Sequence, residues 1–261
     1  MNRFFTWDSG PVQRDPLMAT RGRADLSGQA SRAAQRLPWD EFIRRLEWLP
    51  GEHVALVGPT GQGKTTLLLN LLPLRQFVTV FATKPKDESM DRLIRDGYNK
   101  IETWFSYPPR DMPRRVLWPD ATNIDSVDLQ RRVFSDAFEK IYREGGWCVA
   151  VDELWFFVNI LKLERYVKMY LLQARSLGIS FVAATQRPVS VPVEVYDQST
   201  HLFFWRDNDR RNLDRLSEIN SRSSALVREL VANLERYQVL YVNTRTGEMY
   251  RTKAPVPRSS K

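Results

Sequence analysis

The sequence predicts an α/β fold in which a mostly parallel sheet is covered by helices on both faces. Three runs, 53–58, 147–153 and 179–186, are apolar almost throughout and short, as in strands buried on both faces of a parallel sheet. Longer segments with helical periodicity separate these runs, and strands that alternate with helices favour βαβ units. The chain has 261 residues, of which 43% are hydrophobic, so it is long enough to bury a substantial core.

The individual elements follow from apolar periodicity and from glycine and proline stops. In chain order we expect a helix in 37–52, a strand at 53–58, a helix at 64–74, a strand at 77–84 and a helix at 87–97. Residues 98–123 show no clear period. The second half predicts a helix at 125–146, a strand at 147–153, a helix at 160–178, strands at 179–186 and 201–206, a helix at 223–236 and a C-terminal β-hairpin at 237–253.

Composition divides the chain into three parts. Residues 1–37 carry Gly, Ser, Pro, Gln and Arg with little periodicity, and we interpret them as a basic, flexible N-terminal arm. Residues 38–253 form the folded domain, and 254–261 form a C-terminal tail. The net charge of +8 and the pI of about 9.7 favour polyanionic partners such as nucleic acid or anionic lipid, although a solvated basic surface explains them equally well.

Several classes of protein are disfavoured. The single cysteine, Cys148, fits a reducing compartment, and the isolated His53 and His201 offer no metal cluster. The first residues lack the apolar core of a signal peptide, and no window reaches the eighteen apolar residues of a membrane span. We therefore expect a soluble protein that is not secreted.

A glycine-rich motif follows the first apolar strand. Its residues are Gly58, Pro59, Thr60, Gly61, Gln62, Gly63, Lys64 and Thr65, followed by Thr66, and they match G-x-x-x-x-G-K-[ST] without a mismatch. Glycines let backbone N–H groups turn toward phosphates, and the following helix presents its positive end to the anion. Lys64 is expected to reach the β- and γ-phosphates, and the Thr65 hydroxyl to ligate Mg²⁺. The motif predicts a nucleoside triphosphate site that uses ATP and Mg²⁺.

Two further strand ends carry matching chemistry. Asp152 and Glu153 end an apolar run, where Asp152 can hold Mg²⁺ and Glu153 can orient or deprotonate the attacking water. Gln186 ends the next strand. If that strand lies between the other two, the amide of Gln186 is expected near the γ-phosphate.

Together these motifs resemble the FtsK–HerA superfamily of hexameric, DNA-pumping P-loop ATPases. The most specific stretch is QARSLGISFVAATQRP, residues 173–188, and the resemblance covers about 50–206. It implies a RecA-like (ASCE) sheet with an extra strand between the phosphate-loop strand and the strand with the acidic pair. It also implies that Gln186 is a sensor and that an arginine finger acts on the neighbouring subunit. Arg175 is the first candidate for this finger, with Arg187 and Arg165 as alternatives.

The resemblance also implies partners. Its members work as rings on double-stranded DNA without reading sequence, so we expect a homo-oligomeric ring, a hexamer or a pentamer. The absence of accessory domains makes the chain most similar to genome-packaging ATPases of membrane-containing, double-jelly-roll viruses. That likeness implies a capsid vertex or portal partner and a location in the host cytoplasm or at the virion packaging vertex. Candidate DNA-contacting cations are Lys84, Lys86, Arg110, Arg114 and Arg115.

Other functions remain open from the sequence. A membrane-associated assembly or secretion ATPase would act on protein partners instead of DNA. A conjugation or repair translocase would use the same motor for another purpose. A nucleotide-dependent adaptor would bind ATP without hydrolysing it.

Overall fold

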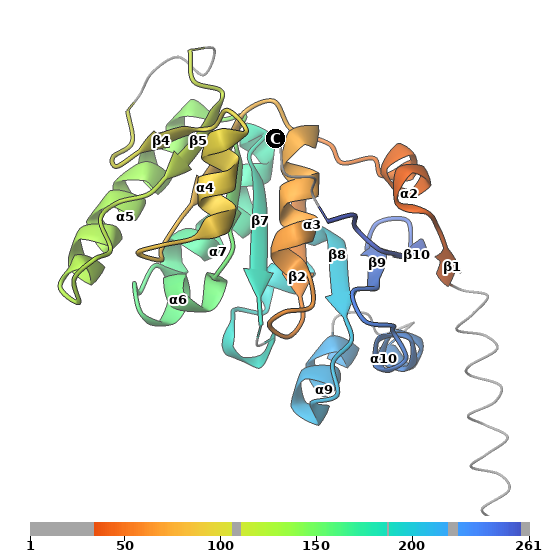
Figure 1. The fold of residues 1–261 in the computed structure, drawn as a ribbon. Coiled ribbons are helices and arrows are strands. Elements are labelled where there is room, and N and C mark those ends of the chain that lie inside the picture. Colours follow the sequence, from red (N-terminus) through yellow and green to blue (C-terminus); the bar gives the residue numbers. More distant parts are fainter. Residues whose placement is uncertain (1–33, 106–110, 187, 219–223, 257–261) are drawn as a thin grey trace, which may run out of the picture.

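A ten-stranded sheet runs through the chain in the computed structural model, which describes residues 34–105, 111–186, 188–218 and 224–256 (Figure 1). Across the sheet the strands are β1 (Ala34–Arg36), β10 (Met249–Thr252), β9 (Val239–Asn243), β8 (Ser199–Trp205), β2 (His53–Val57), β7 (Ser180–Thr185), β6 (Cys148–Val151), β3 (Val78–Phe81), β5 (Arg114–Leu117) and β4 (Asn99–Ile101). Neighbouring strands from β8 to β4 are parallel, whereas β9 runs antiparallel to β8 and β10.

Helices cover both faces of this sheet. The α-helices are α2 (Trp39–Arg45), α3 (Lys64–Leu71), α4 (Glu88–Arg95), α5 (Ser126–Glu144), α6 (Leu154–Asn159), α7 (Glu164–Gln173), α8 (Glu194–Asp197), α9 (Arg210–Glu218) and α10 (Ser224–Ala232). Short 3₁₀ turns are η1 (Leu72–Leu74), η2 (Ala174–Leu177) and η3 (Pro188–Ser190). The predicted fold class, with its C-terminal hairpin, is confirmed.

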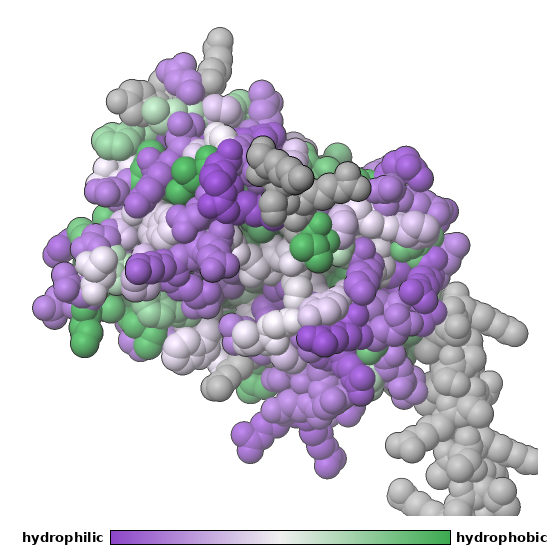
Figure 2. All heavy atoms as spheres, viewed as in Figure 1, coloured by the Kyte–Doolittle hydropathy of each residue, from purple (hydrophilic) through white to green (hydrophobic). Residues whose placement is uncertain are grey.

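Two hydrophobic cores explain why the central strands are apolar throughout. In β2, Val54 and Leu56 pack into the core under α2, α3 and α4, whereas Ala55 and Val57 pack into the core under α5, α6, α7 and α10. Strand β6 alternates in the same way. In Figure 2 the face that carries α3 and α4 is covered mainly by hydrophilic side chains, because the apolar sides of these helices face the sheet.

The order of the central strands places the chain segments that carry the motifs side by side. Strand β7 lies between β2 and β6, as the sequence predicts for a sheet with an inserted strand. The register aligns Val57 with Thr185, and Val151 with Ala183. Residues that follow these three strands therefore leave the sheet at one common edge.

Residues 98–123 and the N-terminal arm differ from the expectation. The aperiodic region contains β4 and β5, whose short length leaves too few residues for a periodic signal. Residues 34–36, expected in the flexible arm, form β1 beside β10. Residues 1–33 lie outside the described residues, as do Arg110 and Arg187.

Two of the proposed DNA-contacting arginines take part in packing. Arg115 is 1% exposed, its guanidinium lies 4.5 and 4.7 Å from the rings of Trp104 and Trp147, and it donates to the carbonyls of Phe105 and Met112. The expectation that Arg115 contacts DNA is therefore wrong. Arg114 begins β5, and its guanidinium lies 5.8 Å from the ring of Tyr98.

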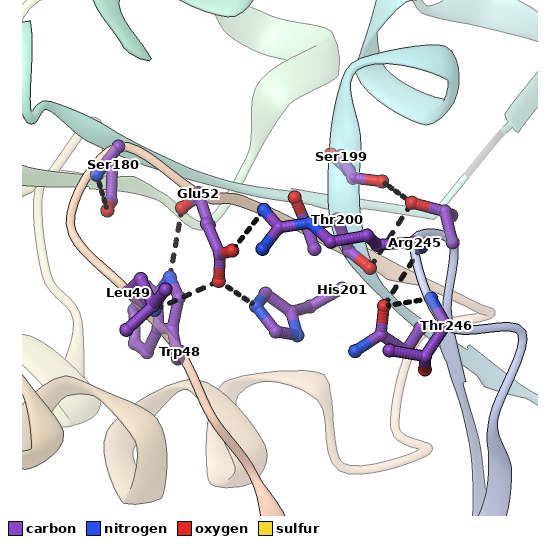
Figure 3. A network of polar contacts seen from close by, with 12 residues as sticks. Trp48, Leu49, Glu52, Ser180, Ser199, Thr200, His201, Arg245 and Thr246 are labelled. Carbon is purple, nitrogen blue, oxygen red and sulfur yellow. Dashed lines mark hydrogen bonds and ion pairs between the residues drawn. The ribbon is translucent and has the colours of Figure 1, made fainter. Parts of the chain in front are cut away.

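A buried polar network lies at the opposite edge of the sheet from the motifs. Glu52 is 3% exposed, and its carboxylate bonds to Nε2 of His201 at 2.9 Å, to the backbone N–H of Leu49 and to the guanidinium of Arg245 (Figure 3). The Nδ1 atom of His201 lies 2.9 Å from the hydroxyl of Tyr241. The network joins the start of β2 to β8 and to the β9–β10 hairpin, so we infer a structural role.

Candidate nucleotide site

The glycine-rich loop connects β2 to α3, which begins at Lys64. Gly61 and Gly63 have φ angles of +76° and +100°, in the left-handed region that favours glycine. A Cβ at Gly58 would lie 2.7 Å from Cβ of Trp205, at the end of the neighbouring strand β8, so this position has no room for a side chain. The loop is thus shaped as a concave turn with the N-terminus of a helix at its end.

Lys64 lies inside this loop. Its ammonium donates to the carbonyl oxygens of Gly58 and Pro59 at 2.6 and 2.7 Å, and the residue is 7% exposed. Burial lowers the pKa of Lys64 to about 8, although the negative charges of Asp152 and Glu153 oppose this shift. A buried cation of this kind is well suited to an anionic ligand, whose charge would stabilise the ammonium.

Thr65 and Asp152 form the expected pair. The Thr65 hydroxyl donates to Oδ2 of Asp152 at 3.0 Å, with Oδ1 at 3.3 Å. Burial raises the pKa of Asp152, and the hydrogen bond from Thr65 partly offsets this effect. No group of three or more His, Cys, Asp or Glu side chains that could hold a metal exists among the described residues. A hydroxyl and a carboxylate fit Mg²⁺, which proteins commonly bind through one or two side chains together with substrate phosphates.

Glu153 follows Asp152 at the start of α6. Its Oε1 atom lies 2.8 Å from Nζ of Lys84, which also lies 3.6 Å from Oδ2 of Asp87. Burial lowers the pKa of Lys84, but its hydrogen bond and ion pairs with Glu153 and Asp87 outweigh this, and the net pKa is raised. Lys84 follows β3, the strand beside β6, so this contact depends on the strand order.

Gln186 contacts the phosphate loop directly. Its Oε1 accepts a hydrogen bond of 2.6 Å from the Thr60 hydroxyl. Gln186 therefore joins the end of β7 to the loop after β2, where it can respond to any movement of that loop.

One cavity of about 640 Å³ collects these groups. A volume of this size suits a nucleotide-sized ligand. The residues expected from sequence that line it are Thr60, Gly61, Gly63, Lys64, Thr65, Thr66, Asp152, Glu153 and Gln186. Gly58, Pro59 and Gln62 complete the loop without lining the cavity. Lys84, expected from the sequence as a candidate DNA contact, also lines this cavity. The sequence did not predict the remaining lining residues, which are Trp205, Tyr237, Val239, Lys253, Ala254 and Val256.

Arg175, the first candidate for the arginine finger, lies away from the cavity of its own chain. Arg175 is in η2, ahead of β7, and its carbonyl oxygen would lie 2.5 Å from a Cβ at Gly51, just ahead of β2. Both positions are at the edge of the sheet opposite the phosphate loop. Arg165 is exposed near the start of α7. That end of the helix is the one closer to the sheet edge that carries the phosphate loop. Within one chain, Arg175 therefore does not reach the cavity.

No protein-family model matches the chain, and no curated protein matches it by sequence. Solved structures do match. The DNA-packaging ATPase B204 from Sulfolobus turreted icosahedral virus superposes with a TM-score of 0.60 at 16% identity, covering 80% of this chain and 100% of B204.

The genome packaging NTPase B204 from Sulfolobus turreted icosahedral virus 2, in complex with ATP-γS, gives a TM-score of 0.58 at 17% identity, covering 80% and 100%. The bacterial conjugative coupling protein TrwBΔN70 gives a TM-score of 0.52 at 10% identity, covering 87% of this chain and 94% of the TrwBΔN70 chain. These similarities concern the arrangement of strands and helices that positions the cavity. The chain has the fold of P-loop ATPases, with strand β7 inserted between β2 and β6 as expected from the sequence.

Proposed function

We propose that the protein is an Mg²⁺-dependent ATPase that translocates double-stranded DNA and packages a viral genome into a procapsid. The observation that carries the proposal is the convergence of Lys64, the Thr65–Asp152 pair, Glu153 and Gln186 on one cavity. These groups come from three segments, the loop after β2, the end of β6 and the end of β7, and the parallel register brings the segments together. A chance glycine loop would not be accompanied by the other three.

The site residues divide the chemistry of ATP hydrolysis among them. Backbone N–H groups of the loop and the Lys64 ammonium bind the phosphates. Thr65 and Asp152 would hold Mg²⁺, which neutralises charge on the β- and γ-phosphates when bound. Glu153 orients a water and accepts its proton.

Gln186 would report the state of the γ-phosphate to the loop; this role is supported by the hydrogen bond that its amide oxygen accepts from Thr60. A finger from a neighbouring subunit would then complete the site. Arg175 on the opposite edge is consistent with action in trans, since it cannot serve its own cavity. We therefore propose a ring, a hexamer or a pentamer, in which each nucleotide lies at a subunit interface.

Double-stranded DNA is the proposed substrate of the motor. A net charge of +8 favours sequence-independent contact with phosphates, and the likeness to B204 points to the same polymer. Lys86 is exposed on the loop before α4 and remains a candidate contact. We propose a capsid vertex or portal as the docking partner, with the host cytoplasm or the packaging vertex as location. None of the described helices is long and apolar enough to cross a membrane.

Phosphate release by the purified protein, measured with and without duplex DNA, tests this function. We expect turnover that requires Mg²⁺ and rises with duplex DNA of any sequence. Turnover that no length of DNA stimulates would contradict translocation while leaving the ATPase in place.

The likeness to TrwBΔN70, which covers 94% of the TrwBΔN70 chain, favours a second candidate, a conjugation motor. Like packaging, it predicts stimulation by DNA, so the capsid distinguishes them. Procapsid-dependent DNA protection from nuclease is expected for packaging only. A membrane-associated assembly or secretion ATPase would instead be stimulated by vesicles or protein partners and not by DNA.

A further inference from the structure

The cavity extends across the sheet in two directions from the phosphate loop. Lys84, Glu153 and Gln186 follow strands β3, β6 and β7 on one side of β2. On the other side, the cavity is lined by Trp205 at the end of β8, by Tyr237 just before β9 and by residues that follow β10. The hydrolytic groups and the aromatic residues thus lie on opposite sides of the loop.

Tyr237 has an unusual backbone. Its φ angle is +63°, a value that residues other than glycine adopt rarely, and it is 38% exposed. A Cβ at Gly63 would lie 3.8 Å from Cδ1 of Tyr237 and 3.8 Å from Nε1 of Trp205. The ring of Tyr237 is therefore held beside the end of the phosphate loop. Because Tyr237 is exposed, packing in a hydrophobic core does not account for its rare backbone conformation.

Two cations lie over the same ring. The guanidinium of Arg236 is 4.8 Å from the ring centroid of Tyr237, and Nζ of Lys253 is 5.5 Å from it. Lys253 lines the cavity and Arg236 does not. Lys253 is also exposed, so its flexible side chain can give up its place over the ring to a flat ligand.

The segment after β10 supplies the other wall. The carbonyl oxygen of Pro255 accepts a hydrogen bond of 3.1 Å from Nδ2 of Asn70, on the helix that starts at the phosphate loop. Ala254 packs against the core beneath that helix. Val256 lines the cavity although it is 82% exposed. The segment is therefore fixed to α3 and leaves an apolar side chain facing the cavity mouth.

We propose that Tyr237 and the segment Lys253–Val256 form the base subsite of this cavity, with the ring of Tyr237 stacking on a nucleobase. The inference rests on the proposed function, because it names the part of the nucleotide that would bind on the Tyr237 side of the cavity. Phosphates bound at Gly63, Lys64 and Thr66 direct the nucleoside away from the loop, and the two candidate directions differ in chemistry. The side with Asp152 and Glu153 carries carboxylates, whereas the side with Tyr237 and Val256 offers a ring and an apolar wall beside the cation Lys253.

The ligand class that fits is a nucleoside triphosphate with a purine base. A phenol ring stacks on any base, and the larger surface of a purine gains more from the contact. Stacking carries no hydrogen-bond readout, so we expect ATP and GTP to bind with similar affinity and pyrimidine nucleotides more weakly.

The test compares ATP with inorganic tripolyphosphate as competitors of a fluorescent ATP analogue. Tyr237→Gly removes the ring and suits the left-handed backbone, and it should weaken ATP binding by ~5- to 150-fold, the range for loss of one stacked base. Tripolyphosphate has no base, so its affinity should not change. Tyr237→Phe keeps the ring and should bind ATP like the wild type. A chain that ends at Lys253 removes the other wall and should also weaken ATP selectively.

The outcomes separate the two levels of the argument. If Tyr237→Gly weakens ATP and tripolyphosphate equally, or neither, the base subsite is wrong while the phosphate site remains. Equal affinity of the wild type for ATP and tripolyphosphate would also overturn it. If the wild type binds neither ligand, the proposed ATPase itself fails. Thermal unfolding of each variant with and without ATP checks that a loss of affinity is not a loss of fold.

Discussion

The ammonium of Lys84 lies 2.8 Å from a carboxylate oxygen of Glu153, so a cation after β3 holds the group proposed to activate water after β6. Both side chains are partly exposed, 43% and 30%, and a pair of this kind adds little to stability. Its consequence is positional. The ammonium occupies one of the two carboxylate oxygens of Glu153, so movement of β3 relative to β6 would change which oxygens a water can reach.

Replacement of Glu153 by glutamine tests the proposed base. The amide keeps the shape of the side chain but cannot accept a proton, so we expect turnover to fall by ~10²- to 10⁴-fold. ATP binding should persist, because Lys64 and the loop are unchanged. Phosphate release and analogue binding on the same preparation check both statements. Turnover like that of the wild type would indicate another base, and an absence of turnover in the wild type as well would favour the adaptor function.

Replacement of Lys84 by alanine tests the hold on Glu153. We expect the free energy of unfolding to change by less than about 1 kcal/mol, as for other exposed pairs. Turnover without DNA should rise, because Glu153 is freed, and the stimulation by DNA should shrink. Urea unfolding and phosphate release measure the two effects. A loss of turnover accompanied by weaker ATP binding would place Lys84 among the phosphate-binding groups instead.

Mixing two inactive variants tests the trans arginine. Arg175→Ala should lower turnover by ~10³- to 10⁵-fold if Arg175 is the finger. In a mixed ring, an Arg175→Ala subunit supplies an intact Glu153, and a Glu153→Gln neighbour supplies an intact Arg175. We therefore expect the mixture to regain turnover that neither variant has alone. The same mixture made with Arg165→Ala identifies the finger if Arg175 fails, and no recovery with either would argue against trans action by these residues.

The sequence predicts those parts of the site that local patterns mark, but not the contacts between residues far apart in the chain. The phosphate loop, Asp152 and Gln186 were predictable because each follows an apolar strand, and parallel strands end at one edge. The contact between Lys84 and Glu153 was not, because it requires knowing that β3 lies beside β6. Arg115 looked like a surface cation because a basic, proline-rich stretch surrounds it. Its burial depends on Trp104 and Trp147, which lie far apart in the sequence.

The residues on the aromatic side of the cavity could not be predicted from the sequence for the same reason. Tyr237 and Val256 belong to the hairpin and the tail, which the sequence presents as an ordinary turn and a short polar end. Only the pairing of β9 with β8, next to β2, brings them to the phosphate loop. No local pattern marks such residues, since neither their spacing nor their type differs from that of a surface segment.

His53 makes stability depend on pH. It is 1% exposed, its Nδ1 accepts the backbone N–H of Phe181 at 3.0 Å, and burial and the charge of Arg175 lower its pKa to about 4. The unfolded chain takes up a proton near pH 6.5, where the folded chain does not. The contribution of His53 to the free energy of unfolding is therefore fully present above pH 6.5 and is lost as the pH falls toward 4. Near pH 5 the loss is about 2 kcal/mol.

Urea unfolding of the wild type and of His53→Gln, each near pH 7 and pH 5, isolates this effect. Glutamine can accept the Phe181 N–H and does not titrate, so the variant should lose about 2 kcal/mol less between the two pH values. His201, whose pKa is lowered chiefly by burial, acts in the same direction in both proteins and cancels in the comparison. An equal loss in both proteins would mean that His53 is protonated in the fold.

Gly58 offers a steric test of the phosphate loop. A Cβ there would lie 2.7 Å from Cβ of Trp205 and 3.4 Å from its backbone nitrogen, so Gly58→Ala forces the loop and β8 apart. We expect a loss of about 1–3 kcal/mol in unfolding free energy, as for other overpacked sites. ATP affinity should fall as well, because the carbonyl oxygen of Gly58 accepts a hydrogen bond from Lys64.

Gly247→Ala is the matched control for that loss of stability. Gly247 has a φ angle of +77° and no atom within 4 Å of an added Cβ, so alanine there costs only backbone strain, about 1–2 kcal/mol. Both variants should therefore lose similar stability, and only Gly58→Ala should lose ATP affinity. Denaturant unfolding and analogue binding on the two proteins make the comparison. Wild-type affinity in Gly58→Ala would mean that the loop keeps its shape without the close approach to Trp205.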